Sequence, residues 1–165
     1  HQTPLDCELW LVASSSEEVG LRGGQTATRA IHPDIALVLD TACWSKNFDY
    51  GSANHRQIGA GPMLVLYDKT LIAPAKLIAL ADTIAQSQGI PLQKDMFSNG
   101  GTDGGAIHLS GTGVPTLVLG PPTRHGHCAA SIADEKDIHH TQQLLVALVA
   151  GMNRETVDHL TDFRC

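Results

Sequence analysis

The chain has 165 residues, of which 42% are hydrophobic, 17% charged and 4% aromatic, and its formal net charge is −6. This length and balance predict one globular domain with a hydrophobic core and exclude extended disorder. The acidic charge, without any run of Lys and Arg, argues against a nucleic-acid partner, and no apolar stretch is long enough to cross a membrane.

Short apolar runs rich in Val, Leu and Ile alternate with helical and glycine-rich segments, which is typical of an α/β domain. In chain order, strands are predicted at residues 8–14, 34–41, 62–67, 92–97 and 115–120. Helices are predicted at residues 24–31, 74–88, 102–110 and 134–152, where apolar residues recur at helical spacing or glycines precede a short turn. The pattern predicts a three-layer fold with a mostly parallel central sheet and helices on both faces, in a single domain over residues 1–165.

Two adjacent carboxylates, Glu17 and Glu18, follow the first predicted strand directly. The carboxyl edge of an open α/β sheet is where such folds place their sites. Adjacent side chains there can diverge, so that one carboxylate ligates a metal while the other acts as a general base towards water. The pair is equally compatible with acidic residues in the first turn of a helix.

Asp40 ends the second predicted strand, and the predicted sheet brings it to the same edge as Glu17 and Glu18. An aspartate at a strand end is often a cap or a loop anchor. A second carboxylate that converges on the first pair favours a metal site instead.

The segment Gly120–His127 follows the last predicted strand and brings Arg124, His125 and His127 to this edge. Imidazole beside carboxylates is a ligand set that suits zinc, cobalt or manganese. Taken alone, the two histidines are better explained as ordinary loop residues than as metal ligands.

A glycine-rich loop at residues 98–105 overlaps the start of the short predicted helix, which begins at Thr102. Its glycines permit close backbone approach to a ligand, and Thr102 or Asp103 can cap the helix. We expect this loop to form a wall of a substrate pocket, with Asp103 in a structural role. It lacks the lysine and the spacing of a phosphate-binding loop.

The four cysteines lie far apart and form no C-x-x-C pair, which favours reduced thiols over a disulfide framework. The first residues show no charged start and apolar middle of a signal peptide. We therefore expect a cytoplasmic protein.

With these residues in place, the chain resembles the M42 family of metallo-aminopeptidases, the glutamyl and tetrahedral aminopeptidase group of zinc exopeptidases. Seven motifs of that family occur here in order, from a Glu-Glu-Val-Gly-Leu-Arg-Gly segment to an Arg-x-x-His segment. They lie at residues 17–24, 33–40, 59–62, 90–93, 100–104, 113–116 and 124–128. The resemblance extends from about residue 9 to residue 152.

The resemblance implies an aminopeptidase that uses two divalent metal ions, zinc or cobalt, to remove N-terminal residues from short peptides. It implies that Glu17 is the general base, that Glu18 and His127 hold one metal, and that Asp40 holds the other. Arg124 and the loop residues Gly101, Thr102 and Asp103 are then expected to lie on the substrate side of the site.

Departures from the family pattern are local: glycines replace alanines at positions 24 and 104, His125 replaces a tyrosine and Cys128 replaces a serine. A larger departure is that the family's N-terminal ligand segment and its inserted β-domain have no counterpart here. We therefore expect the C-terminal part of a catalytic domain, inactive alone, that needs the missing segment or self-association. Members of the family form large homo-oligomers.

Two other readings of the residues are open. The chain is alternatively a non-catalytic interaction or regulatory module with the same fold. Its carboxylates Glu17, Glu18 and Asp40 also resemble the paired acids of a glycoside hydrolase. The low aromatic content and the histidine argue against the hydrolysis of sugars.

Overall fold

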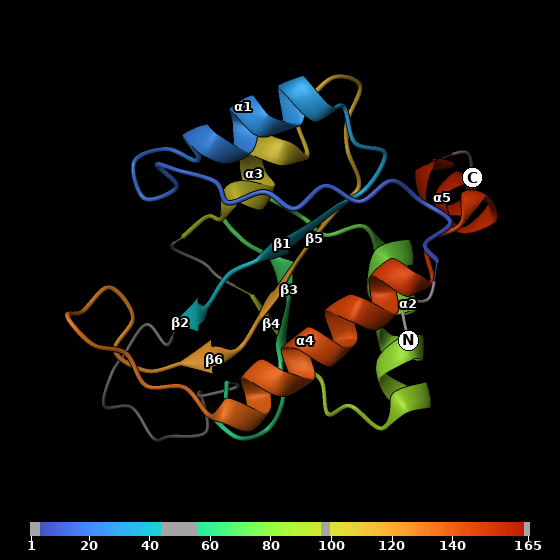
Figure 1. The fold of residues 1–165 in the computed structure, drawn as a ribbon. Coiled ribbons are helices and arrows are strands. Elements are labelled where there is room, and N and C mark those ends of the chain that lie inside the picture. The colour runs from blue at the N-terminus through green and yellow to red at the C-terminus, as the bar shows by residue number, and fades with distance from the viewer. Residues whose placement is uncertain (1–3, 44–55, 97–99, 164–165) are drawn as a thin grey trace.

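The computed structural model describes residues 4–43, 56–96 and 100–163 of the chain (Figure 1). Within these residues, four strands form the main sheet and five helices surround it. In chain order the elements are α1 Arg22–Ile31, β1 Ala36–Leu39, β2 Ala42–Cys43, β3 Met63–Tyr67, α2 Ala75–Gln88, β4 Gln93–Met96, α3 Asp103–Ile107, β5 Thr116–Gly120, β6 Pro122–Thr123, α4 Glu135–Ala150 and α5 Arg154–Thr161.

The main sheet has the strand order β1-β5-β3-β4. β1 pairs with β5 in parallel and β3 pairs with β4 in parallel, whereas β3 and β5 are antiparallel. β1 and β5 therefore end at one edge of the sheet, and β3 and β4 begin there. The short strands β2 and β6 form a separate parallel pair just beyond the ends of β1 and β5. The predicted dominance of parallel pairing is confirmed, with this one reversal.

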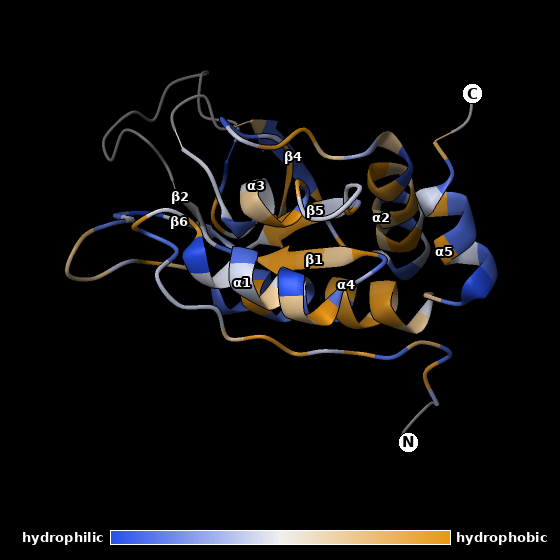
Figure 2. Cartoon of the chain, turned by 90° about the horizontal axis from the view of Figure 1, so that it is seen from above, coloured by the Kyte–Doolittle hydropathy of each residue, from blue (hydrophilic) through white to orange (hydrophobic). Residues whose placement is uncertain are grey.

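Helices cover both faces of the main sheet, as predicted (Figure 1). On one face α2 and α4 pack against β5, and the fully buried residues Leu64, Leu77, Leu117, Leu119, Leu144 and Leu148 form the main core there. On the other face α3 packs against β1 and β5, and α1 lies on α3. A smaller cluster of Val38, Val65, Leu71 and Val118 fills that side. In Figure 2 β1 is coloured apolar, as a strand between two helical layers requires.

The predicted strands at residues 34–41, 62–67, 92–97 and 115–120 are confirmed as β1, β3, β4 and β5, except that residue 97 lies outside the described residues. The four predicted helices are confirmed as α1, α2, α3 and α4. α5 is an additional helix, whose start is capped by the side chain of Asn153, which accepts from the N–H of Thr156. Within the described ranges, no helix is long and apolar enough to cross a membrane.

The prediction of a strand at residues 8–14 is wrong for this structure. These residues have no regular secondary structure and run as an extended segment outside the helices (Figure 2). Leu9, Trp10, Leu11 and Val12 are 47–87% exposed. A strand requires a partner for its backbone ladder, and neither edge of the sheet, β1 or β4, supplies one to this segment. Apolar composition alone therefore does not produce the strand.

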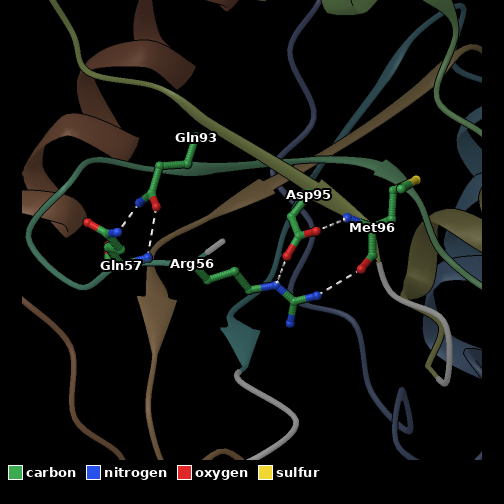
Figure 3. Close-up of polar contacts among 5 residues, drawn as sticks. All are labelled: Arg56, Gln57, Gln93, Asp95 and Met96. Carbon is green, nitrogen blue, oxygen red and sulfur yellow. Dashed lines mark hydrogen bonds and ion pairs between the residues drawn. The ribbon is translucent and has the colours of Figure 1, made fainter. Parts of the chain in front are cut away.

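The segment that leads into β3 lies near the carboxyl ends of β1 and β5 and is held there by hydrogen bonds. The backbone N–H of Gln57 donates to the side-chain oxygen of Gln93, and the Gln57 carbonyl accepts from the side-chain amide of Gln93 (Figure 3). The Arg56 side chain binds the Asp95 carboxylate at 2.6 Å and the Met96 carbonyl at 2.9 Å. From the other side, the buried carboxylate of Asp137 in α4 accepts from the N–H groups of residues 59 and 61, each at 2.7 Å. This segment is thus fixed to both β4 and α4.

Candidate active site

A tight turn between the extended N-terminal segment and α1 presents Glu17 and Glu18. The carbonyl of Glu17 accepts from the N–H groups of Gly20 and Leu21 at 3.1 and 2.9 Å, and the carbonyl of Ser15 accepts from Gly23 at 2.8 Å. A Cβ at position 23 would lie 2.3 Å from the Ser15 backbone nitrogen, so this approach requires glycine. This turn therefore fixes the positions of the two carboxylates, although the strand predicted at residues 8–14 does not form before it.

His127 lies on a loop that follows β6 and is closed at its base by Arg124 and Ile132. These two residues exchange backbone hydrogen bonds of 3.0 and 3.1 Å. His125 and His127 both have positive φ, at 60° and 58°, a conformation that costs energy in residues other than glycine. The strained backbone brings the His127 side chain towards the Glu17–Glu18 turn.

Glu18 and His127 meet in space although 109 positions separate them in the sequence. The His127 Nε2 atom lies 3.1 Å from the Glu18 Oε1 atom, and both side chains are 72% exposed. Because the pair is exposed, it contributes little to stability as an ion pair. Its geometry matters more: two ligand atoms of one tetrahedral zinc, each about 2.0–2.1 Å from the metal, lie about 3.3 Å apart.

Asp40 lies one residue beyond β1, beside the end of β5. Its N–H donates to the Leu119 carbonyl at 3.2 Å, and its own carboxylate accepts from the N–H of Thr41 at 2.6 Å. The backbones approach so closely here that a Cβ at Gly120 would lie 1.4 Å from the Asp40 carbonyl oxygen. The position of Asp40 therefore depends on glycine at position 120.

Electrostatics connect Glu17, Glu18, Asp40, Asp103 and His127. Burial raises the pKa of the Glu17 carboxyl. The negative charges of Asp40, Glu18 and Asp103 raise this pKa further, whereas His127 lowers it. Burial is also the largest cause that raises the pKa of the Asp40 carboxyl, and Asp103 and Glu18 raise it as well. The hydrogen bond from the Thr41 N–H and the nearby His127 lower it. Carboxylates that disfavour one another's ionised forms define a region where a bound cation would be stabilised.

This repulsion predicts a pH-dependent stability for the metal-free protein. A carboxyl with a raised pKa binds its proton more tightly when folded, so it costs stability as the pH rises through that value. Replacing Asp40→Asn should therefore raise the melting temperature more at about pH 8 than at about pH 3, which lies below the ordinary pKa of an aspartate, about 3.9. Asp34→Asn, at the exposed other end of β1, is the control. An Asp40→Asn effect that is equal at both pH values contradicts this prediction.

The glycine-rich loop predicted to form a pocket wall ends at the start of α3. Thr102 is 2% exposed, and its hydroxyl donates to the buried carboxylate of Asp68 at 2.9 Å. Asp103 is 7% exposed and accepts from the hydroxyl of Ser14 at 2.5 Å. At Gly101 a Cβ would lie 2.9 Å from the Thr70 hydroxyl. These side chains are turned towards protein neighbours, and their contact with a substrate stays a prediction.

The structure thus brings Glu18 and His127 together and sets Glu17, Asp40 and Asp103 within electrostatic reach of them. Arg124 lies at the base of the His127 loop, where its backbone pairs with that of Ile132. Among the residues that the structure describes, no three His, Cys, Asp or Glu side chains are close enough to hold a metal ion. Ser14 and Asp68 are not predicted from the sequence, because the contacts that join them to Asp103 and Thr102 link residues distant in the chain.

An α/β fold with carboxylates and a histidine at one sheet edge is typical of metal-dependent hydrolases. The profile of a family described as M42 glutamyl aminopeptidase matches residues 1–144, and the chain belongs to this family. The glutamyl aminopeptidase of Lactococcus lactis is 32% identical over 160 residues, which are 96% of this chain and 44% of that protein.

Solved structures agree with the family membership. A TET aminopeptidase from the marine sediment archaeon Thaumarchaeota archaeon SCGC AB-539-E09 has a TM-score of 0.83 and 37% identity, over 90% of this chain and 41% of that one. A TET1 peptidase from Pyrococcus horikoshii, described as able to assemble into a tetrahedron or a large octahedral shell, shares the fold with a TM-score of 0.70 at 24% identity. That match covers 82% of this chain and 38% of the TET1 chain. The chain therefore spans about two fifths of the length of these relatives.

Proposed function

We propose that the full-length protein is a metal-dependent aminopeptidase that removes N-terminal residues from short peptides. The observation that carries this proposal is the meeting of Glu18 and His127 at 3.1 Å beside Glu17 and Asp40. The relatives are aminopeptidases and therefore hydrolases, and aminopeptidases of the M42 family are metal-dependent.

The described side chains fit part of a metal site. The Glu18–His127 separation suits two ligands of one cation, and Asp40 supplies a carboxylate for a second cation. Because the chain spans about two fifths of the length of its relatives, we propose that further ligands come from chain segments outside these 165 residues. We propose two divalent cations per complete site, zinc or cobalt, and we expect the 165 residues alone to be inactive.

Glu17 is the proposed general base. When bound, the cations would polarise the scissile carbonyl and lower the pKa of the attacking water. The Glu17 carboxylate would take the proton of that water and deliver it to the leaving amine. Burial, the first cause of the raised pKa of Glu17, supports this role, because a base whose pKa is closer to the working pH transfers protons in both directions more effectively.

The proposed activity is tested with the full-length protein on short peptides with free or acetylated N-termini. We expect release of the N-terminal residue from free peptides only, loss of activity with a chelator, and recovery on addition of Zn²⁺ or Co²⁺. Metal binding without peptide turnover would instead support the interaction or regulatory module. Hydrolysis of aryl glycosides without peptide turnover would support the glycoside hydrolase.

The proposed ligand role of His127 predicts a loss of metal affinity on substitution. Replacing His127→Ala should weaken Zn²⁺ binding at one site by at least about 10²-fold, because removing even groups that support a ligand costs about 10–100-fold. His125→Ala is the matched control, since His125 has the same backbone conformation on the same loop. Isothermal titration with Zn²⁺ measures both variants. Equal affinities in the two would show that His127 is not a ligand.

We further propose that the full-length protein forms homo-oligomers in the cytoplasm. The assembly of the TET1 peptidase that shares this fold supports the oligomer. The exposed apolar residues Leu9–Val12 supply surface that an interface can cover. The free thiols of Cys7 and Cys128 are compatible with a reducing compartment.

A further inference from the structure

Asp103 links the turn that carries Glu17 and Glu18 to the helical layer formed by α1 and α3. Its carboxylate is almost fully buried at the start of α3, and its Oδ2 atom accepts from the Ser14 hydroxyl at 2.5 Å. A Cβ at Gly24 in α1 would lie 2.8 Å from the Oδ1 atom, so glycine at that position makes room for the carboxylate. Within the described residues, Oδ1 accepts no hydrogen bond.

Asp103 is itself held firmly by its neighbour Thr102. The Thr102 hydroxyl donates to Asp68, which is 1% exposed. The other carboxylate oxygen of Asp68 accepts from the N–H and hydroxyl of Thr70 and from the N–H of Leu71, at 2.7–2.8 Å. These hydrogen bonds hold the start of α3 against the loop after β3, and they therefore fix the position of Asp103.

Ser14 is the residue at which the extended N-terminal segment enters the Glu17–Glu18 turn. From Ser15 onward the turn is closed by backbone hydrogen bonds to residues 20–23, so it moves as a unit with the start of α1. Residues 8–13, directly before Ser14, are exposed and pair with no strand of the sheet. The hydrogen bond from Ser14 to Asp103 is thus the side-chain contact that connects the N-terminal side of the turn to α3.

We propose that Asp103 is a positioning residue that fixes the turn carrying Glu17 and Glu18 through its hydrogen bond from Ser14. This inference rests on the proposed function, in which Glu17 and Glu18 take part in the reaction. In this role Asp103 acts through Ser14, separately from the substrate contact that the family resemblance predicts. A misplaced turn would leave substrate binding nearly unchanged but lower the rate of the chemical step.

The kinetic test uses the full-length protein with Ser14→Ala, Asp103→Ala, the double variant and Asp103→Asn. A small misplacement of reacting groups costs up to about 10²-fold, so we expect kcat to fall about tenfold or more in Ser14→Ala, with KM changed by less than about twofold. The double variant should equal Asp103→Ala. Asp103→Asn should retain most of kcat, because its amide oxygen still accepts from Ser14.

The control is Thr116→Val, which removes a fully buried hydroxyl at the far end of β5. It should lower the melting temperature without lowering kcat. An unchanged kcat in Ser14→Ala, or effects of Ser14→Ala and Asp103→Ala that multiply in the double variant, would overturn the proposal. So would an Asp103→Asn variant as impaired as Asp103→Ala, since that result assigns the effect to charge.

A second measurement does not depend on peptidase activity. Hydrogen–deuterium exchange at the amides of residues 20–23 should be at least about fivefold faster in Ser14→Ala and unchanged in Thr116→Val, because the turn would open more often. Unchanged exchange in Ser14→Ala would overturn the proposal. Faster exchange in a protein without aminopeptidase activity supports the anchoring by Asp103 and contradicts only the proposed function.

Discussion

Replacing Glu17→Gln in the full-length protein should lower kcat about 10³-fold, because general acid–base catalysis typically contributes about 10²–10⁴-fold. Glutamine keeps the shape of the side chain but cannot take a proton from water. The position of the turn depends on backbone hydrogen bonds and on Ser14, so it should survive the substitution. Release of N-terminal residues from a free peptide, measured at saturating substrate, gives the change in kcat.

Two measurements accompany the Glu17→Gln assay. Glu155→Gln, an exposed substitution on α5, should keep full activity and controls for the loss of one carboxylate. Zn²⁺ affinity should be nearly unchanged in Glu17→Gln, because the proposed ligands are Glu18, His127 and Asp40. A kcat within tenfold of the wild type would remove Glu17 from the role of general base and leave the metal site to be judged separately.

Replacing Gly120→Ala should cost about 3 kcal/mol of the free energy of unfolding or more, at the upper end of what overpacking typically costs. The new Cβ would lie 1.4 Å from the Asp40 carbonyl oxygen, and a backbone atom cannot move away as a flexible side chain can. The ends of β1 and β5 would have to separate, which breaks the hydrogen bond from the Asp40 N–H to Leu119. Chemical denaturation measures the loss.

Gly100→Ala is the matched control for Gly120→Ala, because no atom lies within 4 Å of the Cβ that it would add. Its free energy of unfolding should stay within about 0.5 kcal/mol of the wild type. Gly120→Ala should also weaken metal binding at the site that includes Asp40, since that carboxylate moves with its backbone. A Gly120→Ala protein as stable as the Gly100→Ala protein would show that the two strands do not approach this closely.

Much of the fold could be predicted because its signals are local. The apolar runs that form β1, β3, β4 and β5, and the helical spacing in α2 and α4, depend on residues close together in the chain. α5 is short and mostly polar, with only Val157 and Leu160 packed against the core, so its local sequence does not predict a helix. The reversal between β3 and β5 could not be predicted, because a buried strand has the same apolar composition in either direction.

The predicted site residues follow apolar runs in the sequence, where strands are expected to end. Asp40 follows β1 as predicted, and the His127 loop follows β5, with the unpredicted short strand β6 between them. Glu17 and Glu18 follow a segment that does not form the predicted strand, although Glu18 still lies 3.1 Å from His127. The Ser14–Asp103 contact spans 89 positions and involves two common polar residues, so nothing in the local sequence indicated it.

The reversal between β5 and β3 also determines what borders the edge where β1 and β5 end. Met63 at the start of β3 lies opposite Gly120, so the chain that precedes β3 runs alongside this edge. The N–H group at position 61 is bound by Asp137, which lies 76 positions further on in the first turn of α4. Motions of that helical turn should therefore be transmitted to the surroundings of Asp40, and a ligand that orders one should order the other.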